Sequence, residues 1–376
     1  MLQVALLKSE KALAAWKEWR PQIDFEGEFD FATFRLLPLA YENLNALGIK
    51  APELMRFKGA YRKIWCETHQ LFHETAGAVR ALEQAQIDTM LLKGAPLVLR
   101  YYKNYATRAM YDLDILVRPE CARDAIATLE RAGWTRNAST HEEDLKYRHA
   151  MQFFNAAGRE LDLHWHVFFE CSQDGADDTL WHYSQPMDFN GIRTRSLDPT
   201  HLLLHVVVHG VRSNPEPPIR WIPDAMKVLQ HAGHEIDWDR LISEAKNRRF
   251  VSRLRLGLRY LKERFDAPVP TDVLSRLASA PVTLTERIEN TVILGDQEAL
   301  YQSHSRNIWL IFADYQRFTA GQGFWPSLIG FTHYLRYRLG MEGRADLVKN
   351  AFQGLLRRLK RAVRTDDRHR RPASSK

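Results

Sequence analysis

The pattern of apolar residues between positions 87 and 117 changes its period twice. The run Met90–Leu92 is too short for a helix and predicts a buried strand. After Pro96, residues 97–102 read as a helix, because proline is favoured in the first helical turn. From Tyr111 to Val117, acidic and apolar residues alternate, which is typical of a strand with one buried face. The order predicts a strand, a tight turn, a helix and a second strand.

Helical periodicity flanks this segment on both sides. Apolar residues recur at spacings of three and four through residues 1–83 and again after Asp198. Between these stretches the sequence predicts an amphipathic helix at 119–132 and a strand pair at 147–155 and 160–168. We therefore predict an α+β fold in which a small mixed sheet lies between an N-terminal and a C-terminal helical region.

Four regions are expected along the chain. They are an N-terminal helical region at 1–84, an α/β core at 85–196, a C-terminal helical region at 197–364 and a basic, disordered tail at 365–376. The aromatic residues of the first region are more typical of a core than of a binding site. They include Trp16, Trp19, Phe31, Phe34, Trp65 and Phe72.

The candidate catalytic residues are acidic and lie in two predicted strands. Asp112 and Asp114 lie two positions apart, so their side chains project from one face of the strand. Neighbouring carboxylates in an apolar strand repel one another and lose solvation unless a cation compensates. Asp162, in the last strand of the predicted pair, is the candidate third carboxylate. Because Mg²⁺ prefers such oxygen ligands, we predict a magnesium site for two-metal phosphoryl transfer, with Mn²⁺ as the alternative ion.

Two other interpretations of the last strand stay open. Asp162, His164 and His166 share one face of it, and imidazoles suit a transition metal such as zinc better than Mg²⁺. Alternatively, the three residues form a solvated face.

A second histidine pattern follows Asp198, which is placed to cap a helix. His201, His205 and His209 recur every four residues and so share one helix face. A polar stripe packed against the core is the commoner outcome of this spacing, and a metal site is the rarer one.

The turn at Lys93-Gly94 predicts a phosphate site. A strand-to-helix turn points backbone N–H groups and the positive end of the helix dipole at whatever lies above it. Glycine lets the backbone approach a ligand closely, and Lys93 adds a mobile positive charge.

Taken in order, the Lys93-Gly94 turn, the helix and the strand with Asp112-Leu-Asp114 resemble the core of the polymerase-β-like nucleotidyltransferases. In particular, the chain resembles bacterial nucleotidyltransferase-family proteins with Lys-Gly at the turn, an arginine before the Asp pair, here Arg108, and a later Asp-Leu-His-Trp, here Asp162–Trp165. Better-known members have Gly-Ser at the turn, so the serine's phosphate contact falls here to Lys93 or to the backbone. The resemblance extends from the N-terminal helical region to about Pro270.

This resemblance implies transfer of a nucleoside monophosphate from an NTP, with ATP favoured, to a hydroxyl of a protein, peptide, sugar or other small molecule. The implied site consists of catalytic and metal-binding Asp112, Asp114 and Asp162, nucleotide-binding Lys93, Gly94 and Arg108, and His164 and Asp224 as substrate contacts or supports. One alternative is a nucleotide-sensing module that has lost turnover. Another is an interaction protein that recruits RNA or acidic membrane.

Charge and composition limit the partners. The segment Leu356–Lys376 carries nine lysines and arginines and two aspartates, a net +7 that equals the charge of the whole chain. A polyanion or an acidic membrane is therefore expected to contact the tail rather than the formally neutral body. Three widely spaced cysteines, no signal peptide pattern and no apolar run long enough for a bilayer predict a cytoplasmic protein.

Overall fold

The structure is a computed structural model. It describes residues 1–25, 27–136, 145, 148–212, 219–294, 304–319, 330, 331, 334, 335 and 338. The chain forms two compact units, residues 1–294 and 295–376. The first unit contains the sheet and all the candidate site residues, and the second contributes one described helix, α15 (His304–Phe318).

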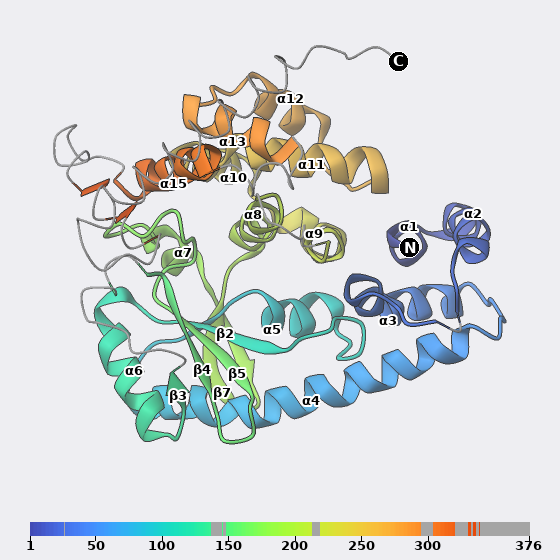
Figure 1. The fold of residues 1–376 in the computed structure, drawn as a ribbon, viewed down its shortest axis with the longest axis horizontal. Coiled ribbons are helices and arrows are strands. Elements are labelled where there is room, and N and C mark those ends of the chain that lie inside the picture. The colour runs from blue at the N-terminus through green and yellow to red at the C-terminus, as the bar shows by residue number, and fades with distance from the viewer. Residues whose placement is uncertain are drawn as a thin grey trace, which may run out of the picture. The chain divides into compact units, whose positions relative to one another are not determined.

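Four helices form the N-terminal region, as the sequence predicts (Figure 1). They are α1 (Leu2–Leu6), α2 (Ser9–Trp19), α3 (Phe31–Ala46) and the long α4 (Leu54–Gln84). Trp16 is buried among aromatic neighbours and Phe72 is buried under the sheet, as expected for core residues. Phe31 and Trp65 differ from the prediction, because their side chains are 59% and 47% exposed.

Seven strands form a single mixed sheet in the order β3-β4-β5-β2-β1-β7-β6. Their bounds are β1 Met90–Leu91, β2 Asp112–Leu116, β3 Thr135–Arg136, β4 Ala150–Phe154, β5 Glu160–His164, β6 Gln185–Phe189 and β7 Ile192–Ser196. β2 runs parallel to β5 and antiparallel to β1, whereas β1 runs parallel to β7. The α+β class and the small mixed sheet between helical regions are confirmed.

Helices cover both faces of this sheet. On one face, α4 and α6 (Ala122–Arg131) pack against an apolar layer that includes Leu113, Ile115 and Leu161. The opposite face, which carries Asp112 and Asp114, meets α5 (Gly94–Pro96) and the segment Leu97–Tyr102. Leu97–Tyr102 is helical as predicted, but its hydrogen bonding is that of a π-helix, a form that often occurs at functional sites.

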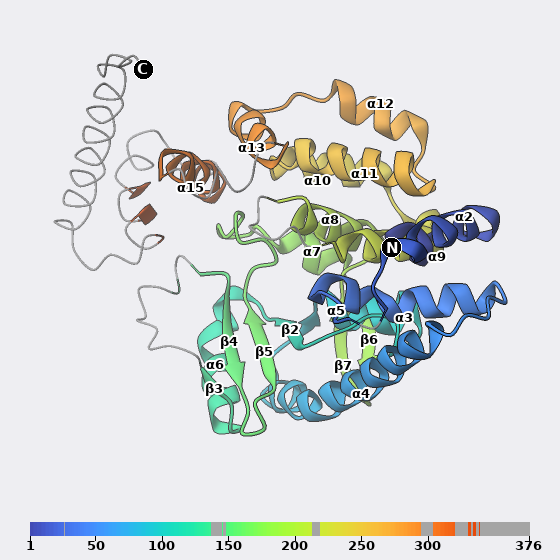
Figure 2. The same ribbon diagram turned by 45° about the vertical axis from the view of Figure 1, so that its right-hand side comes forward.

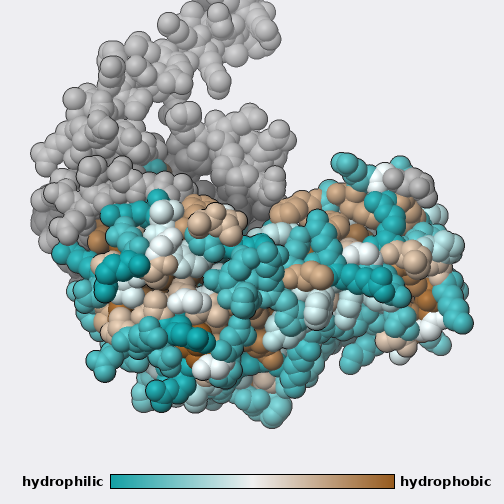
Figure 3. Space-filling view, turned by 90° about the horizontal axis from the view of Figure 1, so that it is seen from below, coloured by the Kyte–Doolittle hydropathy of each residue, from teal (hydrophilic) through white to brown (hydrophobic). Residues whose placement is uncertain are grey.

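The remaining α-helices in the described part of the first unit lie before β6 or after β7. They are α7 (Asp178–Tyr183), which precedes β6, and then α8 (Pro199–Gly210), α9 (Trp221–Ala232), α10 (Trp238–Asn247), α11 (Val251–Phe265), α12 (Thr271–Ser279) and α13 (Leu284–Leu294). Figure 2 shows α8 between the sheet and the layer formed by α11 and α12. Seen from below, the face crossed by α4 is mainly hydrophilic with scattered apolar residues, so it presents no single large apolar patch (Figure 3).

The strand predicted at 160–168 is wrong at its end. The backbone N–H groups of Trp165 and His166 both donate to the carbonyl of His149, at 2.9 and 3.2 Å. Two residues on one strand thus face one residue on the other, which is the geometry of a β-bulge and ends the alternation of side chains. His166 therefore leaves the face that carries Asp162, and its Nδ1 lies 3.1 Å from Asp177 Oδ2.

Some predictions lie outside what the structure describes. The basic tail at 365–376 and most of the aromatic segment before it fall outside the described residues. The boundaries near residues 84 and 196 stay predictions. Within the described ranges, no helix is both long and apolar enough to cross a membrane.

Asp198 caps the N-terminus of α8, as predicted. Its Oδ1 accepts the backbone N–H of His201 at 3.4 Å and lies 2.5 Å from His201 Nδ1, while Oδ2 lies 2.5 Å from Arg240 Nη2. Burial alone would raise the pKa of Asp198, but the hydrogen bond from His201 and the charges of His201 and Arg240 outweigh burial and lower it. His201 is buried in this cap, and none of the three α8 histidines belongs to a metal-like cluster among the described residues.

We expect Asp198→Ala to lower the free energy of unfolding by about 1–2 kcal/mol through loss of the cap. Asp198→Asn keeps a capping oxygen and isolates the ionic part. Because the folded-state pKa is lowered, the stability difference between wild type and Asp198→Asn should be full above about pH 4 and shrink as the pH falls through the folded pKa. Urea unfolding between pH 3 and 7 measures it, and a difference that grows with acidity would contradict the assignment.

Candidate active site

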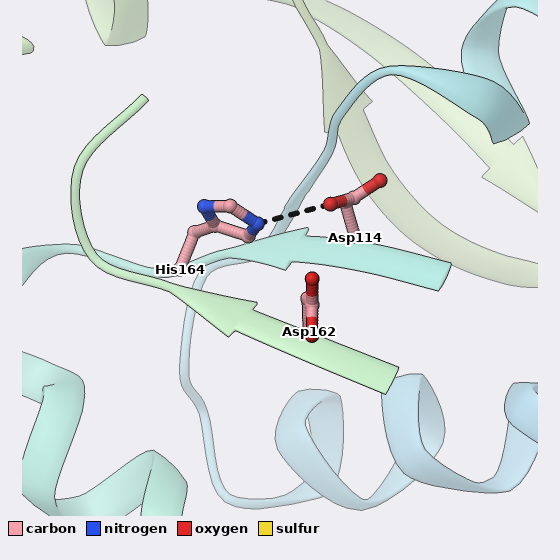
Figure 4. A group of neighbouring side chains, drawn as sticks. All are labelled: Asp114, Asp162 and His164. Carbon is pink, nitrogen blue, oxygen red and sulfur yellow. Dashed lines mark hydrogen bonds and ion pairs between the residues drawn. The ribbon is translucent and has the colours of Figure 1, made fainter. Parts of the chain in front are cut away.

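Pairing between β2 and β5 brings the predicted carboxylates together. The parallel register places Asp112 opposite Glu160 and Asp114 opposite Asp162. Figure 4 shows Asp114 rising from β2, and Asp162 and His164 rising from β5, on the same side of the two strands. The side-chain ligand atoms of Asp114, Asp162 and His164 all lie within 4.8 Å of one another, and so do those of Asp112, Glu160 and Asp162.

Asp162 belongs to both groups and therefore joins them into one acidic cluster. Glu160 is a member that the sequence analysis missed. Its signal was present, because Glu160 lies two positions before Asp162 in the same strand and so shares its face. Oxygen-rich groups at this spacing suit Mg²⁺ or Mn²⁺. Although His164 adds a nitrogen, His166 is turned away, so the predicted set of Asp162, His164 and His166 does not form a metal site.

Asp114 is the most strongly held carboxylate. It is 3% exposed, and its Oδ1 lies 2.5 Å from Lys93 Nζ and 3.0 Å from His164 Nε2. Burial alone would raise the pKa of Asp114, but the charge of Lys93 and the contact with His164 outweigh burial and hold the pKa well below its usual range. Asp114 is therefore ionised throughout the physiological pH range.

The other two aspartates are destabilised by this charge. Burial and then the charge of Asp114 raise the pKa of Asp112. The same two causes raise the pKa of Asp162 to about 6. Unlike Asp114, Asp162 has no side-chain hydrogen bond to any described residue. A divalent cation between the three carboxylates would relieve their repulsion, so the residues present fit a metal site.

Lys93 stands at the predicted turn in an unusual backbone conformation. Its φ of +46° is in a region that residues other than glycine rarely occupy, and such strain typically costs roughly 1–3 kcal/mol. The strain places the ammonium group against Asp114. Burial alone would lower the pKa of Lys93, but the charge of Asp114 outweighs it and raises the pKa, so Lys93 stays charged.

Arg108 lies behind the turn in a buried ion pair. Its Nε and Nη2 donate to the two carboxylate oxygens of Asp224 at 2.8 and 2.9 Å, and the Tyr102 hydroxyl donates to the same carboxylate at 2.8 Å. A Cβ added at Gly94 would lie 2.7 Å from Arg108 Nη1 and 2.6 Å from Met110 Cε. A side chain at position 94 would therefore have to displace Arg108 or Met110, a constraint that the sequence did not reveal.

Several histidines lie close to the Lys93 ammonium group. The rings of His149 and His164 meet edge to face with centroids 5.3 Å apart, and those of His205 and His209 stack at 5.9 Å. Burial and then the charge of Lys93 lower the pKa of His205 to about 3 and that of His209 well below its usual value. His205 and His209 are therefore neutral at physiological pH and add no charge beside the acidic cluster.

Of the predicted site residues, the structure brings five together on one face of the β2–β5 pair: Lys93, Asp112, Asp114, Asp162 and His164. Arg108 and Asp224 meet each other beside Gly94 rather than the carboxylates. A phosphoryl-transfer protein is the class that an acidic cluster beside a strand-to-helix turn indicates.

Comparison with known proteins agrees with this class. Residues 32–266, more than half of the chain, match the model of a family described as uncharacterised nucleotidyltransferase, and the chain belongs to this family. Membership of a nucleotidyltransferase family, as predicted from the sequence, is thus confirmed. The polymerase-β-like superfamily and the bacterial subgroup with Lys-Gly and Asp-Leu-His-Trp stay predictions.

Among solved structures, the chain is similar to an antigenic nucleotidyltransferase-like protein from Paracoccidioides brasiliensis. The identity is 12%, the match covers 61% of this chain and 99% of the other, and the TM-score is 0.36. A TM-score this low does not establish a common fold. No curated protein matches the chain.

The buried pair of Arg108 and Asp224 gives a stability prediction. Asp224→Ala should lower the free energy of unfolding by about 3–5 kcal/mol, because it leaves a buried guanidinium without its partner. As a control, Tyr102→Phe removes one hydrogen bond to the same carboxylate and should cost about 1 kcal/mol. Denaturant unfolding measures both. A loss below about 1 kcal/mol for Asp224→Ala would mean that Asp224 does not support the fold.

Charge repulsion in the acidic cluster gives a second prediction. Asp162→Asn should raise the stability of the metal-free protein by about 1 kcal/mol, because it removes one of three crowded charges. The same variant should lose most of the stabilisation that Mg²⁺ gives to the wild type.

Thermal unfolding in EDTA and in Mg²⁺ measures both effects. Asp88→Asn, which changes an exposed aspartate ahead of β1, is the control and should behave as wild type. Equal stabilisation of wild type and Asp162→Asn by Mg²⁺ would exclude Asp162 as a ligand.

Proposed function

We propose that this protein transfers a nucleoside monophosphate from an NTP to an acceptor hydroxyl. One observation carries the proposal: carboxylates from two adjacent parallel strands converge beside the Lys93-Gly94 turn in a chain of the nucleotidyltransferase family. Phosphoryl transfer needs positioning and charge stabilisation rather than a covalent nucleophile. An acidic cluster with bound metal would supply both.

Asp112, Asp114 and Asp162 would hold the metal, Mg²⁺ or Mn²⁺. When bound, the metal would neutralise phosphate charge and orient the reacting oxygens. Asp162 is the base of choice, because Asp114 is already engaged by Lys93 and His164, whereas Asp162 has no hydrogen bond to a described residue. It would take the proton of the acceptor hydroxyl as that oxygen attacks the α-phosphorus.

The turn would hold the triphosphate. During transfer, the bond between the α-phosphorus and the oxygen that bridges it to the β-phosphorus breaks. The electron pair leaves with that oxygen, and pyrophosphate departs. Backbone N–H groups at the start of α5 and the Lys93 ammonium group are suited to the phosphates. His164 would orient Asp114 through their 3.0 Å contact.

In this proposal, Arg108 has a different role from the one predicted from the sequence. The sequence analysis assigned Arg108 to nucleotide binding. In the structure, two hydrogen bonds join its guanidinium group to the carboxylate of Asp224. We propose that the pair supports the turn from behind, with Arg108 Nη1 directed at Gly94. Asp224 then acts as a support rather than as a substrate contact.

A nucleotide-sensing module without turnover is the second candidate. The observation that favours it is the ion pair between Lys93 and Asp114, because a lysine already neutralises a carboxylate that would bind metal. ATP as the preferred NTP, the class of acceptor and the cytoplasmic location stay predictions under both candidates.

The test is incubation of the purified protein with α-labelled NTPs and Mg²⁺, with and without lysate of its host. Wild type should transfer label to a discrete species, and the Asp112→Asn/Asp114→Asn variant should lower transfer by at least about a thousandfold, as expected when transition-state charge loses its support. Asp88→Asn is the matched control for an exposed aspartate.

Two other outcomes would decide against the enzyme. Mg²⁺-dependent NTP binding without transfer, lost in the double variant, would favour the sensing module. Absence of NTP binding in the wild type would contradict both candidates.

A further inference from the structure

Three arginines gather on the Gly94 side of Asp112. Arg220 Nη1 donates to the carbonyl of Ala109 at 3.1 Å, and Ala109 lies three residues before Asp112. Burial, and then the charges of Arg108 and Arg35, lower the pKa of Arg220 to about 10, while the charges of Asp224 and then Asp112 act in the opposite sense. The guanidinium groups are thus close enough to repel one another beside the acidic cluster.

Only one of these three arginines is paired with a carboxylate in the described part of the chain. Arg108 is held by Asp224, whereas neither Arg35 nor Arg220 forms an ion pair with a described residue. Partly buried cations that repel one another reduce stability unless an anion lies between them. Such an arrangement is expected where a protein binds an anionic ligand.

Arg35 is fixed in place by two aromatic rings. Its Cζ lies 3.6 Å from the ring centroid of Phe31 and 4.8 Å from that of Tyr111. The two rings are 5.7 Å apart with planes inclined by 30°. Phe31 and Arg35 are four residues apart at the start of α3, which Asp30 caps by accepting the backbone N–H of Thr33 at 2.9 Å. The helix therefore presents both side chains to Tyr111.

This stack gives the exposed Phe31 ring two contacts at the surface. The faces of a guanidinium group contact aromatic rings, and its edge keeps the N–H groups for hydrogen bonds. Arg35 Nε is buried and has no hydrogen-bond partner among the described residues. Because Arg35 covers Phe31, we interpret the exposed aromatic pair as a platform for the arginine rather than for a flat ligand. Tyr111 directly precedes Asp112, so the platform ends at the first carboxylate.

We propose that Arg35 and Arg220 bind the pyrophosphate end of the NTP. The inference rests on the proposed function and names the residues that hold its leaving group. Guanidinium groups match phosphate oxygens with paired N–H donors. Both arginines also lie near the phosphate turn. The charge of Arg108, whose Nη1 lies beside Gly94, acts on Arg220, and Arg35 stacks on Tyr111, which directly precedes Asp112.

The assignment gives the N-terminal helices a direct part in the reaction. As the bond between the α-phosphorus and the bridging oxygen breaks, negative charge develops on the departing pyrophosphate. Arg35 from α3 and Arg220 ahead of α9 would neutralise that charge. The nucleotide-binding role that the sequence analysis gave to Arg108 thus passes to Arg35 and Arg220.

The test is calorimetric binding of inorganic tripolyphosphate with Mg²⁺ to the full chain and to three variants. Arg35→Gln and Arg220→Gln should each weaken binding by at least about tenfold, because a charge-assisted contact to phosphate is lost. Arg62→Gln, which changes an exposed arginine of α4, is the control and should bind as wild type. AMP, which lacks the β- and γ-phosphates, should bind all four proteins within about twofold.

A stability measurement guards against loss of folding. Removing one of two repelling charges should leave the unfolding temperature of Arg220→Gln unchanged or raise it. Phe31→Ala, which removes the platform but no charge, should weaken tripolyphosphate binding less than Arg35→Gln does. Tripolyphosphate affinities within twofold of wild type in both arginine variants, or no binding by wild type, would overturn the assignment.

The outcomes separate this inference from the proposed function. If the wild type transfers nucleotide and both arginine variants bind tripolyphosphate normally, the function stands and the subsite is wrong. If the arginines govern tripolyphosphate binding but no NTP supports transfer, the subsite stands and the function is wrong.

Discussion

The parallel pairing of β2 with β5 is the constraint on which the candidate site depends. These strands are separated by a helix and a hairpin in sequence, yet their register sets Asp114 beside Asp162 and Asp112 beside Glu160. Side chains opposite each other in adjacent strands are close neighbours, so the backbone ladder alone brings four carboxylates together. The apolar residues between them, such as Leu113 and Leu161, face α4 and α6 and fix that register through burial.

Electrostatics then distinguishes residues that share one face. Lys93 and His164 hold Asp114 in its charged form, and this fixed charge destabilises the ionised forms of Asp112 and Asp162. On the other side of the turn, Asp224 neutralises Arg108, whereas Arg35 and Arg220 have no carboxylate partner among the described residues. The site thus combines a crowded negative cluster with a crowded positive one, an arrangement suited to a metal and a polyphosphate together.

Local patterns were sufficient to predict the acidic strands, the turn and the α+β class, because alternation and proline placement are properties of short segments. They could not predict the bulge at Trp165 and His166, which depends on a carbonyl of the neighbouring strand. Nor could they pair Arg108 with Asp224, which are 116 positions apart. Nor could they predict that Phe31 lies at the surface against Arg35 and Tyr111, because Tyr111 is distant from Phe31 in the sequence.

The pair of Arg108 and Asp224 also bears on how separable the parts of this protein are. One partner belongs to the α/β core and the other to α9, beyond the predicted boundary at residue 196. A fragment that ends at that boundary would keep a buried guanidinium and lose its only carboxylate partner among the described residues. The α/β core and α9 are therefore expected to behave as one folding unit, because shuffling, truncation or transplantation of the core alone would remove the carboxylate that neutralises Arg108.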